Sequence, residues 1–231
     1  MPARTPRHGT AARPRRARLM SRPQAEAFLR ALAAANPKPE TELLYSDPFT
    51  LLVAVVLSAQ TTDAAVNRCT PALFAAAPTP ERMAALGPEG IAPFIRTIGL
   101  WQAKARNVAA LAREIVEKHG GRVPDTREAL EALPGVGRKT ANVVLGTAFG
   151  IASGVVVDTH VTRIAQRLEL TREKTPEKIE QDLMRILPRE RWILFSHQVI
   201  HFGRDICKAR KPECGRCPLE TVCRAPDKNV P

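Results

Sequence analysis

Apolar residues recur at helical spacing along almost the whole of this 231-residue chain, and this pattern most constrains its fold. Within residues 23–35, for example, Phe28 and Leu32 fall on one side of a helix. Only residues 155–157, three consecutive valines, resemble a strand, and three residues do not make a sheet. The sequence therefore predicts an all-α fold.

Capping residues and glycines indicate where these helices begin and end. Ser46-Asp47-Pro48 is typical of a helix start, and Gly120-Gly121 is typical of a helix end. The expected helices cover residues 23–35 and 49–59, a segment capped by Asp63, a short segment after Thr79, and residues 100–119, 126–133, 137–149, 159–168, 175–187 and 188–206.

The first 22 residues differ from the rest, with seven arginines, three prolines and no acidic residue. Such a composition cannot bury a core, so we expect a disordered basic tail. No apolar stretch follows Arg15-Arg16, which argues against an export signal and favours a cytoplasmic protein. An arginine-rich organelle presequence stays open as an alternative. The longest apolar run, residues 49–59, has about half of the roughly 20 residues that a membrane span needs.

The charge of the chain indicates an anionic partner. Lysine and arginine total 35 against 23 acidic residues, which gives a formal charge of +12 and a pI near 10.2. An excess of this size favours binding to nucleic acid or to an anionic membrane surface. The sequence contains no basic amphipathic helix of the kind that lies on membranes, so we expect no membrane partner.

Residues 133–140, with the sequence LPGVGRKT, join two expected helices through a tight glycine turn. A P-loop needs glycine before its lysine, where Arg138 stands, and the dinucleotide motif needs a third glycine at Thr140 and a preceding strand. What remains is a helix-hairpin-helix, in which Gly135 and Gly137 let the backbone approach one DNA phosphate at a helix N-terminus. An ordinary glycine turn between packed helices is the alternative.

Lys139 and Asp158 are the expected chemical pair. Lys139 lies beside Arg138 near the start of a helix, and both this cation and the positive end of the helix dipole disfavour its ammonium form. A nucleophilic amine requires the neutral form. The helix extends roughly 15 Å beyond Lys139, and the eight residues after Gly150 can cover up to ~26 Å, so the chain can return Asp158 to the lysine. The plain alternatives are a solvated lysine and an aspartate that only caps the next helix.

Four of the five cysteines fall within seventeen residues, in the pattern Cys207-x6-Cys214-x2-Cys217-x5-Cys223. In a reducing compartment, clustered thiols indicate a metal rather than disulfides. Four thiolates suit zinc or a [4Fe–4S] cluster, and the unequal spacing favours iron–sulfur only modestly. The basic residues between the first two ligands either reach the DNA backbone or form a solvated charge run, and they are Lys208, Arg210 and Lys211.

These motifs together resemble the endonuclease III family of DNA glycosylases. The segments that carry the resemblance are LSAQTTD at 57–63, IGL at 98–100, residues 133–145, VDTH at 157–160 and the cysteine run at 207–223, in the family's order. The likeness covers about residues 23–225 and leaves out the basic tail. The cysteine spacing combined with the lysine-bearing hairpin is highly specific, whereas either alone is less so.

The resemblance implies two α-helical domains with a DNA cleft between them. A six-helix barrel domain that contains the hairpin would span residues 41–152, and an iron–sulfur cluster domain would span residues 153–231. Residues 23–40 would form an N-terminal helix that joins the cluster domain, and residues 1–22 would be the tail. A [4Fe–4S] cluster would bind the four cysteines as a structural or DNA-sensing element rather than as the catalyst.

The resemblance also implies an activity, the excision of oxidised pyrimidines from damaged duplex DNA followed by strand cleavage. Lys139 would attack the sugar C1′ and form a Schiff base, Asp158 would support the attack and the proton transfers, and β-elimination would break the 3′ phosphodiester bond. Gln60 and Leu100 would fill the gap left by the flipped nucleotide, unless Leu100 is a core leucine. The expected DNA contacts are Gln60, Leu100, Gly135, Gly137, Arg138, Thr140, Lys208, Arg210 and Lys211. The implied protein is a monomer of bacterial type that acts at the nucleoid in the cytoplasm.

One stretch departs from the family pattern, because residues 151–154 (IASG) replace a shorter segment that commonly contains proline. This departure puts in doubt how Asp158 approaches Lys139 and how efficient the lyase step is. Two other functions stay open. An adenine-mismatch glycosylase shares the fold and cluster, but such enzymes lack the lysine and carry a large additional C-terminal domain. A non-catalytic, metal-containing DNA-binding protein would keep the basic surface and the hairpin without needing a reactive lysine.

Overall fold

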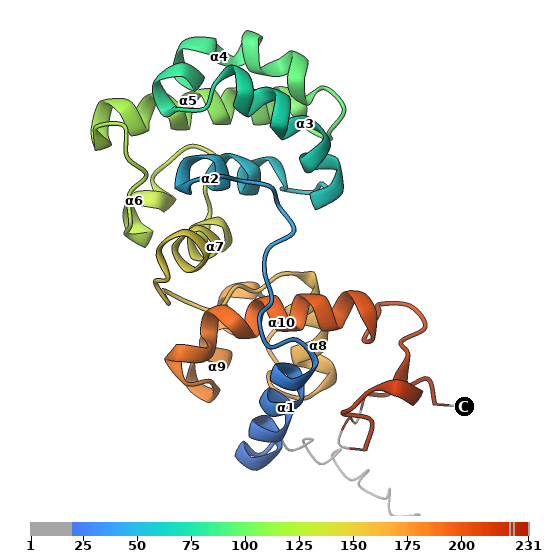
Figure 1. Cartoon of the computed structure of the whole chain (residues 1–231). Coiled ribbons are helices and arrows are strands. Elements are labelled where there is room, and N and C mark those ends of the chain that lie inside the picture. The colour runs from blue at the N-terminus through green and yellow to red at the C-terminus, as the bar shows by residue number, and fades with distance from the viewer. Residues whose placement is uncertain (1–19, 222, 224, 231) are drawn as a thin grey trace, which may run out of the picture.

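Two groups of helices, each closed around its own apolar core, make up the described part of the chain (Figure 1). The structure is a computed structural model that describes residues 20–221, 223 and 225–230. Its helices are α1 (Arg22–Ala35), α2 (Pro48–Leu57), α3 (Asp63–Ala76), α4 (Pro80–Ile95), α5 (Trp101–His119), α6 (Arg127–Glu131), α7 (Arg138–Phe149), α8 (Thr159–Arg167), α9 (Pro176–Ile186), η1 (Arg189–Arg191), α10 (Trp192–Asp205) and η2 (Cys214–Arg216). No strand occurs among these residues, and the predicted all-α fold is confirmed.

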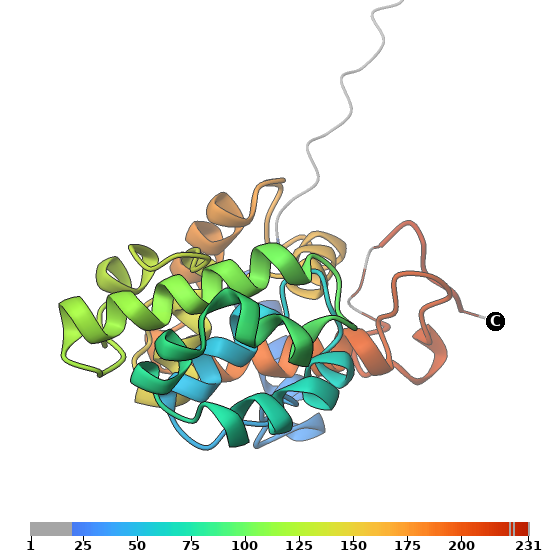
Figure 2. The same cartoon turned by 90° about the horizontal axis from the view of Figure 1, so that it is seen from above.

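Helix α2 is the centre of the first core, which helices α2 to α7 enclose. All residues from Phe49 to Leu57 are buried, as a helix that is apolar on every side requires. Asp47 starts α2 by accepting hydrogen bonds from the N–H groups of Phe49 and Thr50, both at 2.9 Å. Helix α2 packs against α3, α5 and α7, and α4 packs along α5, which extends along the length of this group in Figure 2.

The second core joins segments from the two ends of the chain. Helix α1 packs against α10, where the rings of Phe28 and Phe195 meet edge to face with their centroids 6.1 Å apart. Helices α8 and α9 complete this group, which lies below the first in Figure 1. The chain crosses from α1 to the first group through residues 36–47 and returns through residues 150–158.

The expected tail, residues 1–22, lies outside the described residues except for its last three. For those three the expectation was wrong, because they already belong to the folded part of the chain. The N–H of Met20 donates to the carbonyl of Glu169 at 3.0 Å. Ser21 is the N-cap of α1, and its N–H donates to the side chain of Gln24 at 3.0 Å.

The structure corrects one expectation about a helix start and refines another. Thr62 rather than Asp63 caps α3, since its hydroxyl accepts from the N–H of Ala65 at 3.3 Å. Helix α4 covers 16 residues but is kinked at Gly87, where φ is 65°, so its first part is the short helix expected after Thr79 and a second helical part follows from Pro88. Residues 155–157 are buried and form no strand.

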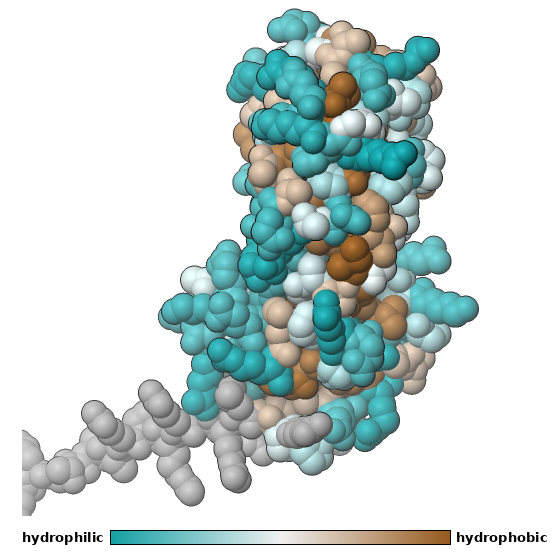
Figure 3. Space-filling view, turned by 90° about the vertical axis from the view of Figure 1, so that its left-hand side faces the viewer, coloured by the Kyte–Doolittle hydropathy of each residue, from teal (hydrophilic) through white to brown (hydrophobic). Residues whose placement is uncertain are grey.

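Charged and polar side chains cover most of the face in Figure 3, where apolar side chains form a broken band down the middle. This distribution agrees with the two enclosed cores. In the part of the chain that the structure describes, no helix combines the length and the apolar character that crossing a membrane requires.

Candidate functional site

The glycine turn before α7 leaves the N-terminus of that helix without a side-chain cap from any described residue. Gly135 has a φ of 77°, and a Cβ there would lie 2.9 Å from the Nδ2 atom of Asn107, so glycine is needed on both grounds. Gly137 is the N-cap of α7, where no side chain caps the helix and a Cβ would meet no atom within 4 Å. The first-turn N–H groups and the positive end of the helix dipole are therefore available to an anion.

Lys139 and Asp158 line one pocket of about 110 Å³ between the two groups of helices. Lys139 lies in the first turn of α7 and is exposed, and its side chain has no hydrogen bond or ion pair with another described residue. Asp158 caps α8 through Oδ1, which accepts from the N–H of Val161 at 2.8 Å. Its Oδ2 atom has no hydrogen-bond partner within the described residues. The pocket thus holds an unpaired amine and a carboxylate with one oxygen free.

Helix α10 supplies another wall of this pocket, and sequence reasoning missed its residues. Arg204 donates to Oδ2 of Asp63 at 2.9 Å and also pairs with Glu42. Burial lowers the pKa of His197, and the charge of His201 lowers it further, so His197 is neutral at neutral pH. No local motif could have revealed Arg204, because Asp63 lies 141 residues before it in the sequence.

Gln60 and Leu100 hold a strained backbone at exposed positions. Their φ angles are 54° and 58°, in the left-handed region that costs a residue other than glycine about 1–2 kcal/mol. Leu100 is 61% exposed, so the alternative that it is a core leucine was wrong. Packing inside the protein does not account for an exposed leucine in this conformation.

The side chain of Arg138, one of the expected DNA contacts, forms an ion pair within the protein. Its guanidinium pairs with the buried carboxylate of Glu180 on α9, and this hydrogen bond raises the pKa of Arg138. Asn142 donates to the other oxygen of Glu180 at 2.9 Å and accepts from the hydroxyl of Ser153 at 2.8 Å. These side chains connect α7 to α9 and to the segment that leads to Asp158. The backbone N–H of Arg138, rather than its side chain, remains for a phosphate.

Residues 151–154, which depart from the family pattern, bring Gly154 into close contact with side chains of α7 and α9. A Cβ at this position would lie 2.0 Å from Oε1 of Glu180 and 2.7 Å from Nδ2 of Asn142, so a larger residue would displace both. The carbonyl of Ser153 accepts from Arg127 at 3.3 Å. The longer segment is thus accommodated by packing against the polar network, and Asp158 lines the same pocket as Lys139.

The four clustered cysteines lie after α10, where N–H donors point at their sulfur atoms. Arg167 donates to Sγ of Cys207 and the backbone N–H of Asn229 donates to Sγ of Cys214, both at 3.3 Å. Burial raises the pKa of Cys217, a hydrogen bond from the backbone of Leu219 lowers it, and the charges of the other three thiols raise it further. Such thiols, surrounded by N–H donors, fit a [4Fe–4S] cluster.

The cysteines do not converge on one point. Among the described residues, no three side chains of cysteine, histidine, aspartate or glutamate are grouped as the ligands of a single ion would be. A cubane cluster does not require such a group, because each thiolate binds a different iron atom.

The basic loop between the first two cysteines presents two free cations. Lys208 pairs with Glu213. Arg210 and Lys211 are exposed and have no hydrogen bond or ion pair within the described residues. Lys211 also has a left-handed φ of 52°. The geometry therefore favours Arg210 and Lys211 over Lys208 as DNA contacts.

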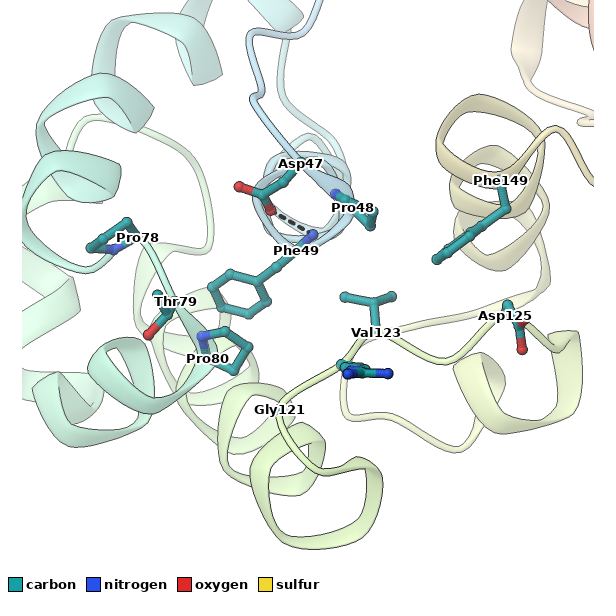
Figure 4. A pocket seen from close by; sticks show the side chains of 11 residues that line it. Asp47, Pro48, Phe49, Pro78, Thr79, Pro80, Gly121, Val123, Asp125 and Phe149 are labelled. Atoms are coloured by element: carbon teal, nitrogen blue, oxygen red, sulfur yellow. Dashed lines mark hydrogen bonds between the residues drawn. The ribbon is translucent and has the colours of Figure 1, made fainter.

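A larger pocket of about 490 Å³ lies at the start of α2, and none of the expected site residues lines it (Figure 4). The carboxylate of Asp47 is occupied there by capping α2, as the dashed bond to Phe49 shows. Pro48, Pro80 and Phe149 make much of the rest of its lining apolar. The pocket therefore lacks the paired amine and carboxylate of the site at Lys139.

Family models match two parts of the chain. A model described as the HhH-GPD superfamily of base excision DNA repair proteins matches residues 53–189, which is more than half of the chain. A model described as the iron-sulfur binding domain of endonuclease III matches residues 207–223, which contain the four clustered cysteines.

Named relatives and solved structures resemble the chain over most of its length. Endonuclease III of Haemophilus influenzae and that of Escherichia coli strain K12 are each 48% identical over 201 residues, which cover 87% of this chain and 95% of the relative. A trapped endonuclease III–DNA covalent intermediate is 44% identical with a TM-score of 0.85, over 89% of this chain and 97% of the other. A thermostable thymine-DNA glycosylase is 25% identical with a TM-score of 0.78, over 87% and 96% of the two chains.

Proposed function

This chain belongs to the endonuclease III family of base-excision DNA repair proteins, and from that premise we propose that Lys139 and Asp158 are its catalytic pair. Its activity is that of a DNA glycosylase that removes oxidised pyrimidines and of an AP lyase that then cleaves the strand. The observation that carries the residue assignment is that an unpaired amine and a carboxylate with a free oxygen line one pocket. A non-catalytic DNA-binding protein would not need this arrangement, and an adenine-mismatch glycosylase lacks the lysine.

Lys139 carries the covalent chemistry. Its neutral amine attacks C1′ of the damaged nucleotide, and the base leaves with the electron pair of the C1′–N bond. The sugar ring then opens at the C1′–O4′ bond, O4′ takes a proton, and a protonated Schiff base joins the lysine to C1′. Loss of a proton from C2′ sends electrons into this iminium group and expels the 3′ phosphate from C3′. Water finally hydrolyses the Schiff base and frees Lys139.

Asp158 prepares the lysine for attack. The amine of Lys139 must lose a proton before it is nucleophilic, and Oδ2 of Asp158 is the acceptor that we assign to it. The bond from Val161 to Oδ1 fixes the orientation of the carboxylate at the start of α8. Arg204 does not compete for this carboxylate, because its charge is already matched by Asp63 and Glu42.

The DNA contacts that we propose fall on three parts of the molecule. The first-turn N–H groups of α7, from Arg138 to Thr140, bind one phosphate beside Gly135 and Gly137. Gln60 and Leu100 enter the gap that the extruded nucleotide leaves. The free cations Arg210 and Lys211 contact the backbone further along.

The [4Fe–4S] cluster of this family is assigned to Cys207, Cys214, Cys217 and Cys223. When bound, it cross-links this segment through iron–thiolate bonds. Arg167 from α8 donates to the carbonyl of Lys208 at 2.8 Å and to Sγ of Cys207, so the segment is also tied to the helix that Asp158 caps. The loop that carries Arg210 and Lys211 is thereby held next to α8, and Asp158 at the start of this helix lines the pocket.

We further propose that the two cores are two domains, residues 41–152 and 153–231, with residues 23–40 joined to the second. A monomer suffices for activity, since one chain supplies every residue that lines the pocket. Solved endonuclease III–DNA complexes support DNA as the partner. The proposed location is the bacterial cytoplasm, at the nucleoid, where that DNA lies.

The proposed chemistry is tested by trapping. A duplex oligonucleotide with one thymine glycol or one abasic site is incubated with the protein, and borohydride is added to reduce the Schiff base. We expect a protein–DNA adduct that survives denaturing electrophoresis, and a nicked strand when borohydride is left out. Tight binding with neither product would contradict the catalytic proposal and favour the non-catalytic DNA-binding function.

Substituting Gly137→Ser tests the phosphate site at the hairpin. Serine is a preferred N-cap, so its hydroxyl would accept from the N–H groups of α7 and remove them from a phosphate. We expect DNA affinity to fall about tenfold, which corresponds to one charge-assisted hydrogen bond, while thermal stability stays equal or rises. Fluorescence anisotropy and thermal unfolding measure the two quantities. Unchanged affinity would place the phosphate elsewhere.

A further inference from the structure

A lysine that the mechanism does not use is buried near the two exposed residues Gln60 and Leu100. Lys104 lies one turn into α5 and is 4% exposed. Its ammonium donates to Oγ1 of Thr61 at 2.7 Å. No ion pair with an acidic group within the described residues includes Lys104.

A buried cation without an acidic partner is unfavourable and calls for a compensating interaction. Burial lowers the pKa of Lys104, and the nearby thiol of Cys69 opposes this shift. The hydroxyl of Thr61, which follows the C-terminal end of α2, supplies one acceptor. The carbonyl ends of α2 also give this region a negative potential, which favours an ammonium group.

The position of Lys104 links two separate turns. Thr61 follows Gln60 directly, and its N–H donates to the carbonyl of Ser58 at 3.0 Å, which closes the turn that holds Gln60. On the other side, the N–H of Lys104 donates to the carbonyl of Leu100 at 3.0 Å. Lys104 therefore contacts both turns. Its side chain bonds to the turn of Gln60, and its N–H bonds to the backbone of Leu100.

We propose that Lys104 is a positioning residue that holds Gln60 and Leu100 in register, so that both enter the duplex together when a nucleotide is extruded. This role rests on the proposed function and extends it to a residue outside the reaction pocket. Each of the two backbones is in a left-handed conformation that it would leave if unsupported. The bond from Lys104 to Thr61 fixes the distance between the two turns.

The substitution Lys104→Met keeps the length of the side chain and removes its charge and its donor. We expect borohydride trapping on a duplex with an abasic site to slow by about tenfold, the loss of one hydrogen bond from a charged group. Trapping on a single-stranded abasic oligonucleotide is expected to stay within about twofold, because a single strand offers no base stack to enter. Lys118→Met, which removes an exposed lysine paired with Glu114 on the same helix, is the matched control and should change neither rate.

A double-mutant cycle separates this role from a general effect on folding. Thr61→Val removes the acceptor, and we expect it to reproduce the loss on duplex DNA. Because both substitutions break the same bond, the double variant should be no slower than either single variant. If the losses in trapping rate of the two single variants multiplied in the double variant, the two residues would act separately, and the proposal would be overturned.

The remaining outcomes are also decisive. Equal losses on duplex and single-stranded DNA would mean that Lys104 serves the fold or the chemistry, and no loss on either would mean that it positions nothing; both results overturn the proposal. Failure of the unaltered protein to form an adduct with either the duplex or the single strand would instead contradict the assignment of Lys139. The single-stranded arm thus tells the two failures apart.

Discussion

Replacing Lys139 with alanine is expected to abolish covalent trapping on both thymine glycol and abasic duplexes. The substitution removes the amine of the proposed nucleophile, and no other lysine of the described residues lines the pocket. Removal of a nucleophile lowers rates by several orders of magnitude, so we expect a fall of at least about a thousandfold. Single-turnover trapping, measured by electrophoresis of the reduced adduct, gives the rate.

Binding and stability should survive this substitution. Lys139 is exposed and has no partner among the described residues, so its removal leaves no buried group unsatisfied. Lys178→Ala, which removes another exposed lysine from the second group of helices, controls for the loss of one positive charge. An adduct that forms at the normal rate in the Lys139→Ala variant would show that another amine is the nucleophile, and the proposed mechanism would fail.

Replacing Asp158 with asparagine is expected to slow formation of the Schiff base by about a hundredfold or more. Asparagine is as good an N-cap as aspartate, so its side-chain oxygen can still accept from Val161 and hold the start of α8. What is lost is the carboxylate that accepts the proton of Lys139, and general-base catalysis contributes about 10²–10⁴ in rate. Single-turnover kinetics on the abasic duplex measure the change.

A comparison with Asp158→Ala separates capping from chemistry. Alanine removes both the cap and the charge, and loss of an N-cap destabilises a protein by about 1 kcal/mol. We therefore expect the alanine variant to unfold at a lower temperature than the asparagine variant, with a similar rate of trapping. If Asp158→Asn trapped DNA at the normal rate and Asp158→Ala only lost stability, Asp158 would be a cap and nothing more.

Local sequence was sufficient for the helical architecture and for the main features of the site. Helical spacing and capping residues predicted most helices, because both act within a few residues along the chain. The hairpin could be inferred from LPGVGRKT for the same reason, and the cysteine pattern indicated a metal cluster. The second helical part of α4, which follows Gly87, was missed, since a proline after glycine is also typical of a helix that ends.

Contacts between distant residues were decided only by the tertiary structure. The partner of Arg138 is Glu180, 42 residues later, and the partner of Arg204 is Asp63, 141 residues earlier. A sequence shows that such residues are charged but not which of them meet, because the meeting depends on how the two cores pack. The same holds for Leu100, whose exposure depends on what surrounds α5 rather than on its neighbours in sequence. Short-range hydrogen bonds and apolar spacing thus determine the elements, whereas burial and charge pairing across the two cores decide which side chains are left free to react.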